Sequence, residues 1–360
     1  MTRLPRDLHP LAWWIWAIGL AAYATNTTNP WLLLLLVGVA GFVVAARRGD
    51  QPWARSFRLY VGLGVAIVVV RVLFRILLGG VEGHVLLDLP RIPLPHWVLG
   101  ITLLGPLTRE ALLAGLYDGL RLAAIVICLG AANALANPKR LLRSVPPALY
   151  EVGTALVVAV TLMPQLAESV QRVRRAQQLR TGATGRIGRL RRFVVPVLED
   201  ALERSLSLAA GMDTRGYGRS GDASPAERRV TGGLLLAGLC GLCVGTYAVL
   251  DHTTPRWLAT PMVVVGLVLC IAGLVSAGRR VGRTVYRPDP WRWPELVVAA
   301  SGLVVGYAGW WLAQHRVLIA YPDVTAAPQA SLLALAGILV GLVPAIAAPA
   351  PRLVLGGARP

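Results

Sequence analysis

Two arginines near the middle of the chain, Arg180 and Arg215, occupy positions from which a guanidinium could enter a pocket on a partner. Each has a small residue four positions earlier, Ala176 for the first and Gly211 for the second, so each pair lies on one face of a helix. A glycine follows each arginine within two residues, as is typical of helix C-termini. A cation is favoured there because it complements the helix dipole, and the planar guanidinium donors fit carboxylates and carbonyls.

Both arginines end segments with a helical pattern. The first segment, Gln165–Thr181, carries an apolar stripe, and Thr181 stands directly after its arginine. The second is predicted to begin at Pro196, because proline suits the first turn of a helix. It ends in the motif Gly211-Met212-Asp213-Thr214-Arg215-Gly216. A basic linker, Thr184–Arg192, is expected to join the two helices.

The other residues that could do chemistry are scattered. The single lysine, Lys139, has no glycine-rich phosphate loop around it, so the sequence predicts no ATP hydrolysis by this chain. The four cysteines lie in apolar stretches, where they act as small packing residues. The five histidines show no metal-ligand spacing. We therefore expect no catalytic residue, no metal site and no cofactor.

The composition is that of a membrane protein. Of the 360 residues, 55% are hydrophobic, and the mean hydropathy is +0.60. The formal net charge of +18 comes from arginines that gather at the ends of apolar runs. Such an arrangement marks cytoplasmic loops rather than a nucleic-acid surface, so nucleic acid is not an expected partner.

We predict an all-α, polytopic helical membrane protein with about eight transmembrane helices and a cytoplasmic pair of coupling helices. Loop charges alternate so that both termini lie in the cytoplasm, with the protein in the plasma (inner) membrane. We expect three regions: an N-terminal transmembrane region (1–144), an interfacial and coupling-helix region (145–221), and a C-terminal transmembrane region (222–360). The predicted spans are Leu11–Tyr23, Trp31–Ala46, Leu59–Leu78, Leu112–Ala136, Thr231–Leu250, Trp257–Ala277, Leu296–Leu312 and Leu332–Ala348.

Two further apolar stretches are expected to lie at an interface. Val145–Met163 is long enough to span, but basic residues flank both of its ends, which predicts that both ends are cytoplasmic. Trp97–Leu104 is too short to span. The segment before it, Glu82–His96, is rich in proline and is expected to be an extracellular loop.

A charged pair is predicted inside the fourth span. Asp118 and Arg121 are three residues apart, so they can meet on one face of the helix. Charged residues inside a membrane helix are functional candidates by default, and a structural pair is favoured here over a functional one.

The two arginine motifs resemble the coupling-helix signature of the transmembrane T component of energy-coupling factor (ECF) transporters, a family that includes membrane subunits of cobalt permeases. The similarity extends from about residue 9 to 221 and includes Leu116-Tyr117-Asp118-Gly119-Leu120-Arg121, Asn133-Ala134-Leu135-Ala136-Asn137-Pro138 and Pro196-Val197-Leu198-Glu199-Asp200-Ala201. This sequence departs from the family pattern at Thr181, where glycine is usual, and at Gly211, where alanine is commoner.

The resemblance implies a scaffold that is not an enzyme. It would join two ABC ATPase subunits to a substrate-binding S component, within membrane lipid, for uptake of a vitamin or a transition-metal ion. The implied ATPase contacts are Arg180 and Arg215; Ala176, Gly211 and Gly216 would allow close approach, and Met212 and Asp213 would shape the second tip.

Two rival functions remain open from the sequence. A membrane-embedded enzyme acting on lipid would need acids or histidines clustered at one depth, whereas the acids here are scattered. A non-transport scaffold could bind anionic lipid through the basic stretch Arg172–Arg192. Co-purification of an ATPase pair would favour transport over both.

Overall fold

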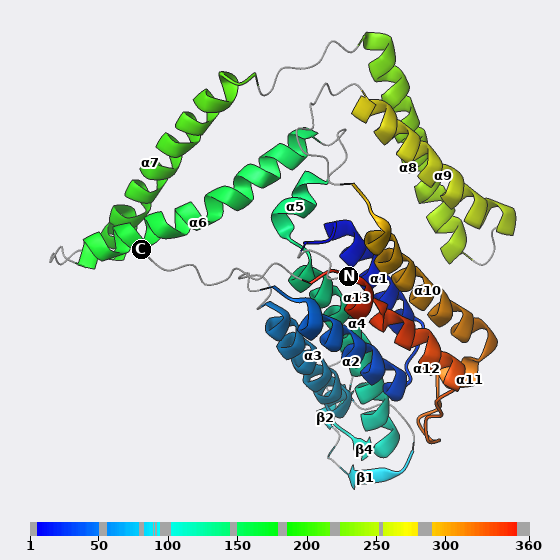
Figure 1. Ribbon diagram of the computed structural model, residues 1–360. Helices are drawn as coiled ribbons and strands as arrows, with labels where there is room; N and C mark the ends of the chain where they lie inside the picture. Colours follow the sequence, from blue (N-terminus) through cyan, green and yellow to red (C-terminus); the bar gives the residue numbers. More distant parts are fainter. Residues whose placement is uncertain are drawn as a thin grey trace. The chain divides into compact units, whose positions relative to one another are not determined.

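The computed structural model describes residues 6–49, 56–78, 83–88, 90, 92–93, 102–144, 150–178, 186–216, 224–251, 255–279 and 290–350. The chain divides into two units, one of Met1–Leu141 with Pro288–Pro360 and the other of Leu142–Arg287. Each unit is described by itself below, with the element labels of Figure 1.

The first unit is a helical bundle with four short strands (Figure 1). Its core helix is α1, on which Trp16 and Tyr23 are completely buried. The Trp16 indole donates to the carbonyl of Gly341 at 3.0 Å, and so ties α1 to the 3-10 turn at residues 340–342. The helices are α1 (Pro10–Thr25), α2 (Pro30–Arg47), α3 (Phe57–Leu78), α4 (Arg109–Leu135), α5 (Pro138–Arg143), α10 (Trp293–His315), α11 (Val317–Ala320), α12 (Leu332–Leu339), the 3-10 turn η4 (Val340–Leu342) and α13 (Val343–Ala347).

Glycines let α1 and α10 approach closely. A Cβ placed on Gly19 would lie 1.9 Å from the carbonyl oxygen of Gly302, and one on Gly302 would lie 2.3 Å from the Cα of Trp16. Two turns further along α10, Gly309 packs against Tyr23 in the same way. Small residues at such a seam allow backbone-to-backbone packing, which is how helices associate where no water is present to drive burial.

The ends of these helices follow from their capping residues. The Asn29 side chain accepts a hydrogen bond from the Trp31 amide at 3.1 Å at the start of α2. Thr108 accepts from the Ala111 amide at 3.2 Å at the start of α4. Between α3 and α4 lie the antiparallel pairs β1 (Val85–Asp88) with β4 (Pro106–Thr108) and β2 (Ile92–Pro93) with β3 (Thr102–Leu103).

The second unit contains two helical pairs, α6 (Tyr150–Gln178) with α7 (Arg186–Asp213), and α8 (Pro225–Leu250) with α9 (Arg256–Arg279). The α8–α9 hairpin has a glycine seam of its own, in which a Cβ on Gly245 would lie 2.6 Å from the Val263 backbone nitrogen. Ser224 and Glu227 form a reciprocal capping box at the start of α8.

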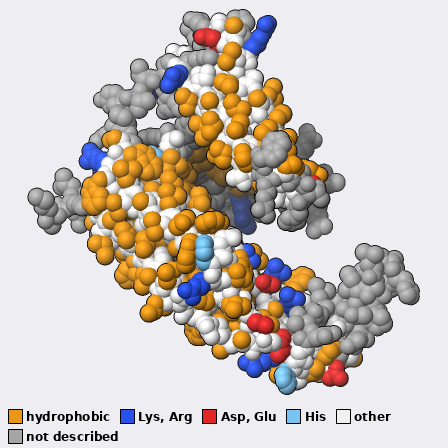
Figure 2. Space-filling view, turned by 90° about the vertical axis from the view of Figure 1, so that its right-hand side faces the viewer, with side chains coloured by type: hydrophobic (Ala, Val, Ile, Leu, Met, Phe, Trp, Pro, Cys, Tyr) orange, Lys and Arg blue, Asp and Glu red, His pale blue; other side chains and the backbone are white. Residues whose placement is uncertain are grey.

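The all-α class is confirmed, and the first seven predicted spans coincide with helices to within six residues. The eighth, Leu332–Ala348, is instead divided among α12, η4 and α13. By length and composition, seven described helices could cross a membrane; they include residues Val152–Ala176 of α6 but neither α1, which has 16 residues, nor the short helices at 332–347. In Figure 2, hydrophobic side chains cover most of the visible flanks of the helices. Most of the predicted interfacial segment Trp97–Leu104 lies outside the described residues.

The C-terminal region differs from the sequence-based division. Residues 222–360 were expected to form one region, but α8 and α9 group with α6 and α7, whereas α10–α13 join the N-terminal helices. A buried ion pair helps to explain this grouping. The Glu295 carboxylate at the start of α10 is completely buried and accepts a hydrogen bond from the guanidinium of Arg6.

Candidate functional site

The two helices that carry the arginine motifs are longer than predicted. Helix α6 runs without interruption from Tyr150 to Gln178, so the stretch expected at the interface and the first coupling helix are one helix of 29 residues. Helix α7 begins at Arg186 rather than at Pro196, which lies inside the helix, so most of the expected linker is helical. A proline inside a helix removes one backbone hydrogen bond, and the 28 residues of α7 supply enough others to continue through it.

The C-terminal end of α7 has the predicted glycine cap. Gly216 adopts φ +74°, the left-handed conformation that glycine tolerates best, and its amide donates to the Asp213 carbonyl at 2.9 Å. The Thr214 hydroxyl donates to the Gly211 carbonyl at 3.0 Å. These bonds satisfy carbonyls that would otherwise be left without partners at the helix end.

Arg215 projects from this cap into solvent. The residue is exposed, and its guanidinium forms no ion pair or hydrogen bond with the parts of the chain that the structure describes. Side chains built on Gly211 or Gly216 would meet nothing within 4 Å, so the helix tip is open on both sides. Asp213 is exposed beside it, and Met212 is half-buried. Among the described residues, the tip therefore offers an open backbone surface and the exposed cation of Arg215 to a partner.

Only part of the first motif can be placed. Ala176 lies in the last turn of α6 and is exposed. Arg180 and Thr181 lie outside the described residues, and so does the glycine that follows them. The segment that contains them joins the end of α6 to the start of α7. The two motifs therefore precede and follow α7, whose ends are about 42 Å apart at 1.5 Å per residue.

Helices α6 and α7 come together in Figure 1, and a polar contact joins them between the two motifs. On α7, Asp200 accepts a hydrogen bond from Arg204 Nε at 3.2 Å through one carboxylate oxygen. Its other oxygen lies 3.5 Å from Arg172 Nη2 of α6 and is shielded from solvent. Ser169, one turn before Arg172, is almost completely buried at this crossing.

The same contacts shift the titration of Asp200. Hydrogen bonding to the Ser169 hydroxyl, followed by that to Arg204, holds the pKa of this carboxyl below its usual value of 3.8. From the sequence, Asp200 was named only as part of the motif that runs from Pro196 to Ala201, and so this contact was missed. The spacing of four residues between Asp200 and Arg204 was the sequence signal that could have predicted their pairing.

The charged residues of α4 have different partners from those expected. Asp118 lies 3.6 Å from the guanidinium of Arg75 on α3, and Arg121 donates a hydrogen bond to the carbonyl of Thr25 at the end of α1. Asp118 and Arg121 therefore each tie α4 to a neighbouring helix instead of pairing with one another. The spacing of three brought them to one side of α4, but packing against α3 and α1 supplied competing partners.

The described residues hold no group of three or more His, Cys, Asp or Glu side chains that could bind a metal ion. Comparison with protein families gives a clear result: residues 1–225 match the family model CbiQ, described as "Cobalt transport protein". The chain belongs to the cobalt transport protein family. No curated protein matches the chain.

Family membership confirms the resemblance seen in the sequence, and it makes this chain a membrane component of a cobalt or ECF-type transport system. Together with its apolar helices, it identifies an all-α, multi-pass membrane protein. The matched residues end at the start of α8, so helices α8 to α13 lie almost entirely beyond the matched part of the chain.

Proposed function

We propose that this protein is the T component of an ECF-type ABC importer, which couples ATP hydrolysis on two partner ATPases to uptake of a vitamin or a transition-metal ion through an S component. The observation that carries the proposal is the exposed Arg215 at the glycine-capped end of α7, with open space around Gly211 and Gly216. A guanidinium that has no partner within the described chain can enter an acidic or carbonyl-lined groove on another subunit.

In this mechanism, α7 carries force between two ATPases. One ATPase would take the segment with Arg180 before the helix, and the other would take Arg215 after it. A single helix of 28 residues transmits a displacement because it moves as one packed element. The contact between Asp200 and α6 would make α6 move together with α7.

The apolar stripe of α7 supplies a second surface. Leu198, Leu202 and Leu206 recur at helical spacing and are each more than 60% exposed, on a helix that is not itself apolar enough to span a membrane. We assign this stripe to contact with the S component, so that movement of α7 reorients that subunit. Substrate selection would then belong to the S component.

The proposed orientation places both termini and the α6–α7 pair in the cytoplasm. A membrane-impermeant thiol reagent applied to whole cells should label a cysteine introduced at Gly83 or Thr253, and none at Ser144 or Gly182. Labelling of Ser144 and Gly182 on opposite sides would mean that α6 crosses the membrane, and it would overturn this orientation.

The test of the function is site-directed cross-linking in the assembled transporter. A photo-reactive amino acid at position 215 should cross-link to an ATPase, whereas the same group at position 198 should cross-link to the S component. Position 198 lies on α7 and position 215 lies two residues after its end, so each is the control for the other. Equal cross-linking of both positions to one subunit would contradict the proposed division of surfaces.

A further inference from the structure

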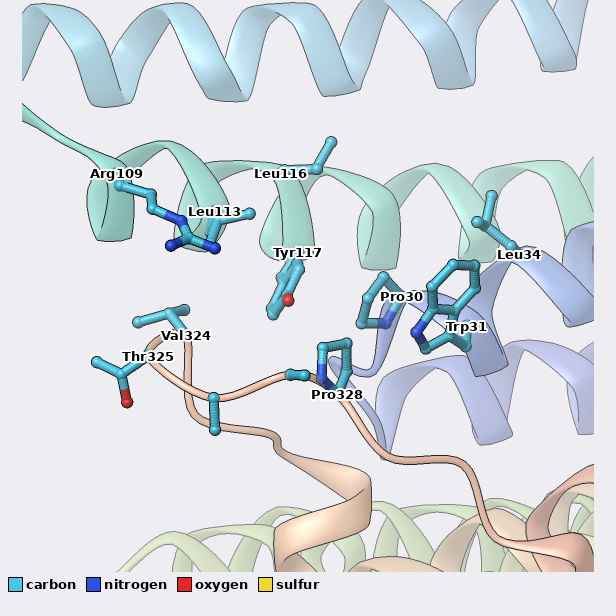
Figure 3. Close-up of a pocket in the computed structure, with 12 residues that line it drawn as sticks. Pro30, Trp31, Leu34, Arg109, Leu113, Leu116, Tyr117, Val324, Thr325 and Pro328 are labelled. Atoms are coloured by element: carbon cyan, nitrogen blue, oxygen red, sulfur yellow. The ribbon is translucent and has the colours of Figure 1, made fainter. Parts of the chain in front are cut away.

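A cavity opens in the first unit where α2 and α4 begin, beside the loop 321–331 between α11 and α12. Its volume is about 370 Å³. Pro30 and Trp31 of α2, Arg109 and Tyr117 of α4, and Pro328 of the loop surround it (Figure 3). Figure 3 shows the side chains of Arg109 and Tyr117 projecting from α4 toward the loop.

The cavity carries a single, unneutralised positive charge. Of its described lining residues, Arg109 alone is charged, and its guanidinium forms no ion pair with the described chain. The neighbouring Glu110 is buried and turns away, because its carboxylate accepts a hydrogen bond from the His84 amide at 2.9 Å. The charge therefore remains available to an anion.

The rest of the lining is apolar and continues onto the outer surface of the helices. Trp31 and Leu34 of α2 are 57% and 50% exposed, and Leu116 of α4 is 39% exposed. Both helices are long and apolar enough to cross a membrane, which would place this surface against acyl chains. Tryptophan and arginine at the end of a span lie at the level of lipid headgroups. A small anion from water could pair with Arg109, but it would not contact these apolar side chains.

We propose that this cavity binds an anionic phospholipid, with the headgroup phosphate on Arg109 and an acyl chain along Trp31, Leu34 and Leu116. An amphiphile matches both halves of the lining, whereas a zwitterionic lipid adds a cationic group that Arg109 repels. The loop 321–331 lies beyond the part of the chain that matches the family model, so one wall of this site comes from outside the matched residues. The proposal does not depend on coupling to an ATPase.

The test is lipid binding to the purified full-length chain, followed by native mass spectrometry. Dimyristoyl phosphatidylglycerol and dimyristoyl phosphatidylcholine are titrated separately, and the anionic phosphatidylglycerol should bind more tightly. Arg109→Gln should weaken phosphatidylglycerol binding about tenfold and leave phosphatidylcholine binding unchanged, which also shows that the variant is folded. Arg109→Lys should keep most of the preference, because the charge is retained.

Arg316→Gln is the matched control, since Arg316 is exposed at the same end of the bundle but does not line the cavity. This control should bind phosphatidylglycerol as the wild type does. An equal loss in Arg109→Gln and Arg316→Gln would reduce the effect to bulk charge and overturn the proposal. Displacement of the lipid by millimolar inorganic phosphate, with the same dependence on Arg109, would assign the cavity to a free anion instead of a lipid.

Discussion

The Arg6–Glu295 and Arg172–Asp200 ion pairs show how differently the helical bundle and the α6–α7 pair are held together. In the bundle, the Glu295 side chain is completely buried, and the pair fixes the start of α10 to the N-terminal segment. Between α6 and α7, the Arg172 side chain is 64% exposed and that of Asp200 is 31% exposed. A buried pair resists separation, whereas an exposed pair is worth little by itself.

The apolar surfaces of the two regions also differ: they are closely packed in the bundle and exposed on α7. In the bundle, α1 meets α10 backbone to backbone at Gly19 and Gly302. Helix α7 instead leaves Leu198, Leu202 and Leu206 exposed within the described chain. The comparison suggests a rigid body and a lightly held pair of helices that can move when other subunits bind.

The largest effect is expected from filling the α1–α10 seam. Gly302→Leu would push a side chain into the backbone of Trp16, and overpacking of this kind costs about 3 kcal/mol of unfolding free energy. Gly41→Leu on α2 is the control, because a side chain there meets nothing within 4 Å. Thermal unfolding in detergent should show a lower Tm for Gly302→Leu and an unchanged Tm for Gly41→Leu. Equal Tm values for the two variants would mean that the seam is not tightly packed.

A smaller loss is expected from the buried ion pair. Arg6→Ala leaves the Glu295 carboxylate buried without its charged partner, but the Arg6 side chain is 25% exposed, so water can reach the site and the cost should be only about 2 kcal/mol. Arg75→Ala removes the partner of Asp118, but both side chains of that pair are about one-third exposed, so the cost should be only about 0–1 kcal/mol. Chemical denaturation of the two variants measures the difference. A larger loss for Arg75→Ala would reverse the ranking of the two contacts.

The smallest effect concerns pH at the α6–α7 contact. Because the folded pKa of Asp200 is lowered, its stabilisation is present above the usual value of 3.8 and is lost as the pH falls through the lowered value. Spin labels on α6 and α7 should therefore report a constant interhelix distance at neutral and mildly acidic pH. The distance distribution should broaden only in stronger acid. Asp200→Asn should remove this pH dependence, and a transition at mildly acidic pH that survives in Asp200→Asn would contradict the assignment.

Much of the fold was readable from the sequence, because membrane spans are long apolar runs and basic residues mark their ends. The glycine cap at Gly216 was also readable, since a small set of residues adopts that conformation. The contacts between helices could not be predicted from the sequence. The partners of Asp118 and Arg121 depend on which helices pack against α4, and the start of α7 was misplaced because Pro196 can lie inside a long helix as well as at its first turn.

The central claim is that Arg180 and Arg215 hold the partner ATPases, and one pair of double variants tests it directly. Arg180→Ala with Arg215→Ala should weaken ATPase co-purification or uncouple hydrolysis from uptake, because loss of a hydrogen-bonded interface charge costs about 2–5 kcal/mol. The control, Arg228→Ala with Arg229→Ala, removes the same charge from exposed positions on α8. It should leave ATPase co-purification and the coupling of hydrolysis to uptake near the wild-type level. If both double variants reduce ATPase binding and uptake equally, bulk charge explains the effect and the two arginines are not coupling residues.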